Sequence, residues 1–134
     1  MAEGRTLVPG VGSGEALVLT EPLSFWGGID PATGAVIDTH HPQLGANVAG
    51  RVLVLPSGRG SSSSSSVLAE AIRAGTAPAA IVLGEPDPIL ALGAIVALEL
   101  YGRTVPVAVM RDPGVSTGDR VTVHADAAGA RLEP

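Results

Sequence analysis

Three short apolar runs, with a helical segment between each pair, constrain the fold of this chain more than any other feature. The runs are residues 51–55 (RVLVL), 79–83 (AAIVL) and 105–110 (VPVAVM). Runs of this kind, apolar at nearly every position, are typical of strands covered on both faces. Residues 66–74 carry apolar side chains at helical spacing, and residues 88–101 are expected to form a second helix. This order predicts parallel strands joined by right-handed helical crossovers, in a mixed α/β fold.

The two ends of the chain are expected to be β-rich. Short strands are predicted at residues 7–8, 15–20 and 35–38, separated by glycine, proline and aspartate. Residues 119–124 alternate between polar and apolar side chains, and together with residues 130–132 they predict a closing hairpin. In the middle of the chain, Gly75 suits the position just past the end of the first helix.

Length and composition limit the architecture further. The chain has 134 residues, 46% of them hydrophobic, which is enough for one core, and we expect a single domain over residues 1–134. Only 2% of the residues are aromatic, so the core is expected to be built from small aliphatic groups. The absence of cysteine excludes disulfides, thiolate zinc sites, cysteine nucleophiles and iron–sulfur ligation by this chain alone. It also favours a reducing compartment.

The charge pattern excludes several classes of partner. Eight basic and thirteen acidic residues give a net charge of -5, with no basic cluster, so we expect no binding to nucleic acid. The amino-terminal sequence lacks a basic region followed by an apolar stretch, so no signal peptide is indicated. The most apolar stretch, residues 89–98, ends at Glu99, well short of the ~20 residues that a membrane span requires. We therefore expect a cytoplasmic protein with no membrane association.

A glycine pattern near the amino terminus has a superficial likeness to a dinucleotide-binding fingerprint. Gly10, Gly12 and Gly14 lie in the sequence GVGSG. That fingerprint must lead into a helix, whereas this one leads into the predicted strand at residues 15–20. We interpret it as a glycine-rich turn or bulge before a strand.

The most unusual segment is PSGRG followed by six consecutive serines, Ser61 to Ser66. A flexible linker has no use between a buried strand and the helix packed on it, and capping a helix needs only one serine. A glycine turn at a helix start gathers free N–H groups and positive partial charge, so we favour a site for a carboxylate or a single phosphate over plain capping. The segment is not a Walker loop, because it lacks the wider glycine spacing and the lysine. Within it, Arg59 is either a clamp for the anion or a solvated turn residue.

The same serines are weak candidates for catalysis on their own. No Gly-x-Ser-x-Gly elbow is present, and nothing in the spacing of His40, His41 and His124 supports a serine esterase. A helix N-terminus stabilises an anion by about 2 kcal/mol at best. One pKa unit corresponds to about 1.36 kcal/mol, so the dipole lowers a serine pKa by only about one unit. A serine general base would need Arg59, further cations or a metal-bound substrate.

Two other segments have alternative interpretations. His40 and His41, with Asp38 nearby, have metal-ligand chemistry, but adjacent side chains of an extended segment point to opposite faces, so we favour a polar loop. Phe25 and Trp26 lie beside Gly27 and Gly28. They indicate either an aromatic plug over the end of a barrel or a loop at a partner interface, where tryptophan is enriched.

Three segments together resemble the small subunit, or swivel domain, of the aconitase X family. They are residues 24–34 (SFWGGIDPATG), 58–61 (GRGS) and 75–83 (GTAPAAIVL), and the resemblance extends over nearly the whole chain. It implies a swivelling β/β/α domain, a barrel-like sheet with two crossover helices. It also implies a hydro-lyase in which a large subunit carries an iron or iron–sulfur centre and the small subunit closes over the substrate. That division would explain how a chain without cysteine belongs to an iron-dependent enzyme.

The resemblance also implies roles for individual residues. The Gly-x-Gly-Ser motif supplies the general base of the family, and this role falls on Ser61. Arg59, with backbone donors from Gly60, Ser61 and Ser62, would hold the anionic substrate. The reactions associated with the family are dehydration of cis-3-hydroxy-L-proline and of 5-phosphomevalonate. The low basic content favours the first. The serine run departs from aconitase, whose motif continues with an arginine, so the residue that assists Ser61 is left open.

Two functions from different classes therefore remain. The first is the small subunit of an aconitase-X-type dehydratase, active only with its large subunit, which would hold the metal centre while this chain binds no cofactor alone. The second is a stand-alone anion-binding module without catalysis.

Overall fold

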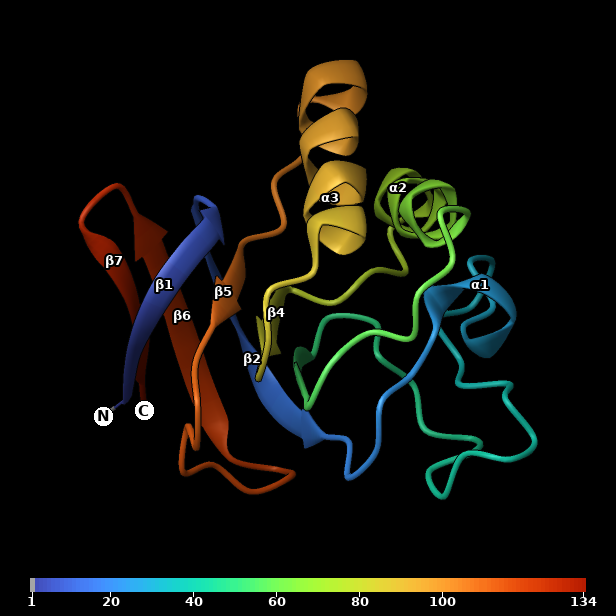
Figure 1. The fold of residues 1–134 in the computed structure, drawn as a ribbon, viewed down its shortest axis with the longest axis horizontal. Coiled ribbons are helices and arrows are strands. Elements are labelled where there is room, and N and C mark those ends of the chain that lie inside the picture. The colour runs from blue at the N-terminus through green and yellow to red at the C-terminus, as the bar shows by residue number, and fades with distance from the viewer. Residues whose placement is uncertain (1) are drawn as a thin grey trace.

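The computed structural model describes residues 2–134 as a barrel with helices on one side (Figure 1). The elements, in chain order, are β1 (Ala2–Val8), β2 (Gly10–Val18), α1 (Phe25–Gly28), β3 (Val52–Leu55), α2 (Ser64–Ala74), β4 (Ala80–Leu83), α3 (Pro88–Tyr101), β5 (Val107–Val109), β6 (Arg120–Asp126) and β7 (Gly129–Glu133). The predicted mixed α/β class, with two crossover helices on a barrel-like sheet, is confirmed.

The sheet closes on itself in the order β1-β5-β4-β3-β2-β6-β7, with β7 returning to β1. Strands β2, β3, β4 and β5 run parallel to one another, and the other pairs are antiparallel. The predicted parallel pairing of the three apolar runs is confirmed, and so is the closing hairpin, formed by β6 and β7. The carboxyl ends of four parallel strands therefore meet at one edge of the barrel.

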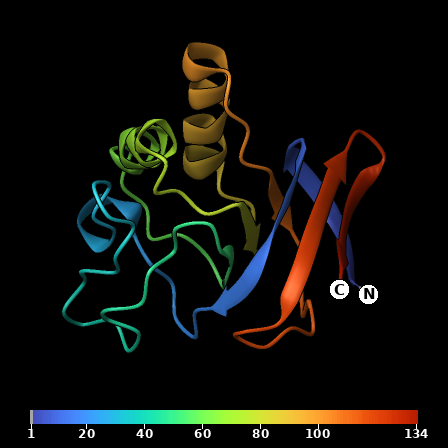
Figure 2. The same ribbon diagram turned by 180° about the vertical axis from the view of Figure 1, so that it is seen from behind.

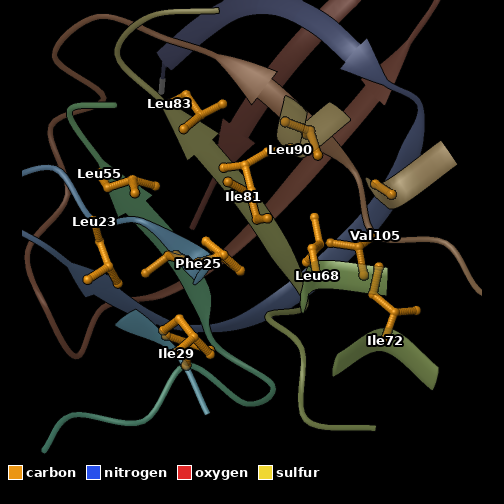
Figure 3. Close-up of a cluster of buried hydrophobic side chains, with 14 of the residues drawn as sticks. Leu23, Phe25, Ile29, Leu55, Leu68, Ile72, Ile81, Leu83, Leu90 and Val105 are labelled. Carbon is orange, nitrogen blue, oxygen red and sulfur yellow. The ribbon is translucent and has the colours of Figure 1, made fainter. Parts of the chain in front are cut away.

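The central strands separate two cores by alternation of side chains. Along β3, Val52 and Val54 belong to a cluster formed by strand residues, which fills the barrel. Leu53 and Leu55 belong to a second cluster, shared with α1, α2 and α3, which lies between the sheet and the helices. Figure 3 shows this second core, where side chains from the loop after β2, from β3 and β4, and from both long helices converge. Mostly alanine and valine side chains thus fill the barrel, and most of the leucine and isoleucine side chains of the core pack between the sheet and the helices.

The interpretation of the GVGSG segment as a turn is wrong. Gly10, Gly12 and Gly14 lie inside β2, which pairs with β6 over this stretch. A Cβ at Gly12 would lie 2.0 Å from the carbonyl oxygen of Ala79, and one at Gly14 would lie 2.3 Å from that of Gly50. The glycines are required because other backbone segments approach β2 more closely than a side chain permits.

Several of the expected elements differ in the structure. α2 begins at Ser64, two residues before the predicted start, and ends as predicted with Gly75 in the left-handed conformation, at φ 81°. The first strand is longer than predicted, because β1 begins at Ala2. Residues 35–38 do not form a strand. They make only isolated bridges, of Val36 to Ile29 and of Ala35 to Asn47, inside a folded loop.

The two ends of the chain lie side by side. Ala2 pairs with Leu132 where β1 meets β7, and both termini lie at the end of the molecule away from α1 and α2, as Figures 1 and 2 show from opposite sides. Within residues 2–134, no helix has the length and apolar character needed to cross a bilayer.

Candidate active site

The loop after β3 is held in an extended conformation beside the segment that leads into α1. Leu23 forms a parallel bridge with Gly58. The N–H of Arg59 donates to the carbonyl of Leu23 at 3.2 Å, and the N–H of Leu23 donates to that of Ser57 at 3.4 Å. The loop that carries the Gly-x-Gly-Ser motif is therefore an ordered extension of the sheet, at the edge where the parallel strands end.

Gly58 allows this loop to contact the start of α3. A Cβ at Gly58 would lie 2.1 Å from Oδ2 of Asp87. Asp87 caps α3, because its Oδ1 accepts hydrogen bonds from the N–H groups of Ile89 (2.9 Å) and Leu90 (3.1 Å). The missing side chain at Gly58 therefore leaves room for the Asp87 carboxylate that caps α3. The loops after β3 and β4 contact each other at this point.

Two serines of the run fasten the first turn of α2 to both neighbouring helices. Ser64 is buried, and its Oγ accepts a hydrogen bond from the backbone N–H of Trp26 at 3.1 Å and lies 3.3 Å from Oγ of Ser24. Oγ of Ser65 donates to the carbonyl of Ile89 in α3 at 2.6 Å. Ser63, at the N-cap, makes no side-chain capping bond. Plain capping therefore does not explain the run.

The four predicted site residues are adjacent and open to solvent. Arg59, Gly60 and Ser62 are exposed, and Ser61 is half-buried. Among the hydrogen bonds of residues 2–134, none is donated by the backbone N–H of Gly60, Ser61 or Ser62. The carbonyl of Ser61 accepts from the N–H of Ser64 at 2.9 Å, which closes the turn into α2. Three free donors therefore lie just before a helix, where an anion is favoured.

The chain alone does not enclose a substrate at this point. The crevice beside Ser61, walled by Leu23, Phe25 and Leu90, has a volume of about 10 Å³. That is room for about one water molecule, whereas ligand pockets have volumes of a few hundred Å³. A reaction at Ser61 would need further walls.

A larger groove at the same edge contains residues that the sequence analysis did not single out. It measures about 470 Å³ and is lined by residues that follow β2, β3, β4 and β5, among them Pro56, Glu85 and Arg111. Asp112 in this groove has a φ of 48°, the only positive value among the non-glycine residues described. The signal that could have located this groove is the rule that parallel α/β sheets bind ligands beyond the carboxyl ends of their strands.

The two adjacent histidines belong to a loop, as predicted. His41 is buried, and its Nδ1 accepts from the N–H of Gln43 at 3.0 Å while Nε2 donates to the carbonyl of Glu21 at 3.2 Å. His40 is exposed. No group of three or more histidine, aspartate or glutamate side chains with metal-binding spacing occurs in residues 2–134.

The two aromatic residues of α1 have different environments. Phe25 is buried between the sheet and α2, whereas Trp26 is 59% exposed. The interpretation as a plug over the barrel end is wrong, because Phe25 belongs to the core outside the barrel (Figure 3).

The charged side chains of α2 form a local pair beyond the serine turn. Arg73 donates to both carboxylate oxygens of Glu70, and this hydrogen bond lowers the pKa of Glu70 and raises that of Arg73.

Arg59 has no ion-pair partner within residues 2–134.

Fold and site together define a class: a closed barrel whose parallel half presents a serine-bearing turn at its carboxyl edge, at the start of a crossover helix. The sequence profile described as the aconitase X swivel domain matches residues 1–131, and the chain belongs to that family. The resemblance noted from the sequence is confirmed. The crystal structure of Thermococcus kodakaraensis aconitase X in its holo form matches with a TM-score of 0.87 and 36% identity, over 99% of this chain and 98% of the matched chain.

Two named relatives differ in length. The cis-3-hydroxy-L-proline dehydratase of Pseudomonas aeruginosa is 61% identical over 104 residues, which are 78% of this chain but 18% of that protein. The phosphomevalonate dehydratase small subunit of Thermococcus gammatolerans is 40% identical over 123 residues, which cover 92% of this chain and 90% of that subunit. The chain thus spans about a fifth of the length of the first relative and nearly all of the second.

Proposed function

We propose that this chain is the small subunit of an aconitase-X-type dehydratase that eliminates water from a hydroxy acid, with cis-3-hydroxy-L-proline favoured over 5-phosphomevalonate. The preference rests on the 61% identity to a relative named for the first substrate, against 40–53% to relatives named for the second. The low number of basic residues agrees with it, because a phosphorylated substrate demands more positive charge.

The observation that carries the proposal is the contrast between Gly58 and Gly60. Gly58 is required by Asp87 within the chain itself. A Cβ at Gly60 would meet nothing within 4 Å, and the φ of Gly60 lies outside the left-handed range. No contact in the described chain demands a glycine there, and we attribute the glycine to a ligand or partner that approaches the backbone closely.

The geometry supports a specific elimination. Oγ of Ser61 removes the proton from the carbon next to the substrate carboxylate, and the electron pair of that C–H bond forms the new C=C bond. The hydroxyl on the following carbon leaves as water, with the proton that it needs donated by an acid of the large subunit or by solvent. The N–H groups of Gly60, Ser61 and Ser62 and the guanidinium of Arg59 hold the carboxylate, which accumulates charge as the proton leaves.

The remaining parts of the site are expected on the large subunit. The helix start lowers the pKa of a serine by only about one unit, which is too little for a free alkoxide near neutral pH. We therefore expect the iron or iron–sulfur centre on the partner, and no residue of this chain is assigned to it. The partner would also supply the walls that the small crevice beside Ser61 lacks.

The test is reconstitution with the cognate large subunit, followed by dehydratase assays on cis-3-hydroxy-L-proline and on 5-phosphomevalonate. Ser61→Ala is expected to assemble normally and to lower kcat by about 10²-fold or more, as loss of a general base does. Ser63→Ala, at an exposed position of the same run whose side chain makes no capping bond, is the control and should keep the full rate. A Ser61→Ala complex with full activity would remove Ser61 from this role. Failure of the wild-type chain to form a complex or to show activity would favour an anion-binding module instead.

A further inference from the structure

Helix α3 leaves an apolar face uncovered. Leu90, Ala94 and Ala97 are buried against the sheet and α2. Five large apolar side chains on the rest of the helix are nevertheless exposed: Leu92 (53%), Ile95 (43%), Leu98 (36%), Leu100 (67%) and Tyr101 (40%). A helix that is apolar all round is typical of a buried helix, and large exposed apolar patches mark interaction sites.

Part of this face forms one wall of a groove between α2 and α3. The groove has a volume of about 450 Å³. Leu92, Val96 and Tyr101 line it from α3, and Ser66 and Ala69 line it from α2. Figures 1 and 2 show the two helices side by side, with their axes at a steep angle to each other. We call this groove the α2–α3 groove.

The α2–α3 groove is continuous with the candidate active site. Ser62, which follows Ser61, lines the groove at the serine turn. Ser65 lines it too, and its Oγ is bonded to the carbonyl of Ile89, within one turn of Leu92. A body that covers Ser61 closely enough to enclose a substrate therefore also reaches the near end of the groove.

We infer that the α2–α3 groove is a docking surface for the larger, metal-bearing part of the enzyme, which inserts apolar side chains against Leu92 and Val96. This inference rests on the proposed function. The Pseudomonas aeruginosa relative places most of its length outside the segment that this chain matches, so a large body is available to cover the face.

The test measures binding of the full chain to its cognate large subunit. Leu92→Glu places a charge in the groove but keeps a good helix former on an exposed position, so the fold should persist. The matched control is Leu44→Glu, at a loop leucine that is 52% exposed and does not line the groove. We expect Leu92→Glu to raise the Kd by about tenfold or more and Leu44→Glu to leave it unchanged, as for a central apolar contact. Val96→Glu serves as a second variant.

The outcomes separate the docking surface from the proposed function. Equal binding by wild type, Leu92→Glu and Val96→Glu, or equal weakening by Leu44→Glu, would overturn the inference. If Leu92→Glu instead abolished self-association measured by sedimentation, with large-subunit binding intact, the occupant would be a second copy and the inference would also be wrong. Binding that depends on Leu92 in a complex without dehydratase activity would support the surface while the proposed reaction failed.

Discussion

The Oγ of Ser64 accepts the backbone N–H of Trp26 at 3.1 Å, which ties the first turn of α2 to α1. Ser64 is 4% exposed, so its removal leaves that N–H without an acceptor. Replacing Ser64 with alanine is expected to lower the free energy of unfolding by about 1–3 kcal/mol, measured by urea denaturation. Ser66→Ala, on an exposed position, should change it by less than about 0.5 kcal/mol. Equal stability of the Ser64→Ala chain would show that the hydrogen bond contributes nothing.

The two motif glycines should respond differently to the same substitution. Gly58→Ala forces a methyl group against Oδ2 of Asp87 and disturbs the cap of α3. We expect a loss of about 1–3 kcal/mol in the free energy of unfolding.

Gly60→Ala should leave the stability unchanged or raise it by up to about 1 kcal/mol, because the position is open and alanine restricts the unfolded chain. The reconstituted dehydratase rate of Gly60→Ala should fall. Thermal unfolding of Gly58→Ala and of Gly60→Ala tests the two expected stabilities, and the dehydratase assay of Gly60→Ala tests the expected loss of rate. A loss of stability in Gly60→Ala with none in Gly58→Ala would contradict the difference between the two glycines on which the proposed function rests.

A methyl group at Gly12 should destabilise the barrel. The added Cβ would overlap the carbonyl oxygen of Ala79, a backbone atom that cannot rotate away. We expect Gly12→Ala to lower the free energy of unfolding by at least about 2 kcal/mol, seen in chemical denaturation. Val11→Thr is the control, since Val11 is 65% exposed on the same strand and threonine keeps the β-branched shape. A Gly12→Ala protein with wild-type stability would mean that β2 can move outward at little cost.

The exposed pair on α2 predicts a pH effect that NMR can detect. Arg73 lowers the pKa of the Glu70 carboxyl by hydrogen bonding. The pair's contribution to stability is thus complete above the unfolded pKa and is lost as the pH falls through the lower folded pKa. Arg73→Gln should raise the pKa of Glu70 toward its ordinary value, followed through the side-chain carboxyl resonance. Added salt should weaken the effect because both groups face solvent. An unchanged titration curve would rule the interaction out in solution.

The α/β half of the fold could be predicted from the sequence because its signals are local. Strands buried on both faces produce continuous apolar runs such as residues 52–55, and Gly75 is the residue type that a left-handed helix end requires. β2 could not be predicted in full, since Gly12 and Gly14 are explained by carbonyls of Ala79 and Gly50, which lie far along the chain. Local propensity assigns such glycines to turns.

In the candidate site, too, local features could be predicted from the sequence and contacts between distant segments could not. A serine-rich turn after a buried strand could be located from the sequence, and the structure places it at the carboxyl edge of β3. The separate tasks of the serines could not be predicted, because Ser64 and Ser65 bond to α1 and α3, elements that only the folded barrel brings together. The role of Asp87 was missed for the same reason, as its contact with Gly58 joins two loops.

The pairing of Ala2 with Leu132 puts both ends of the chain at one corner of the barrel. A covalent joint at either end, in a longer relative, would therefore attach at that same corner. The α1–α2 end, which carries the serine turn, lies at the opposite end of the molecule (Figure 1). In such a relative, a rotation about that joint would move Ser61 through a longer arc than the residues near the termini.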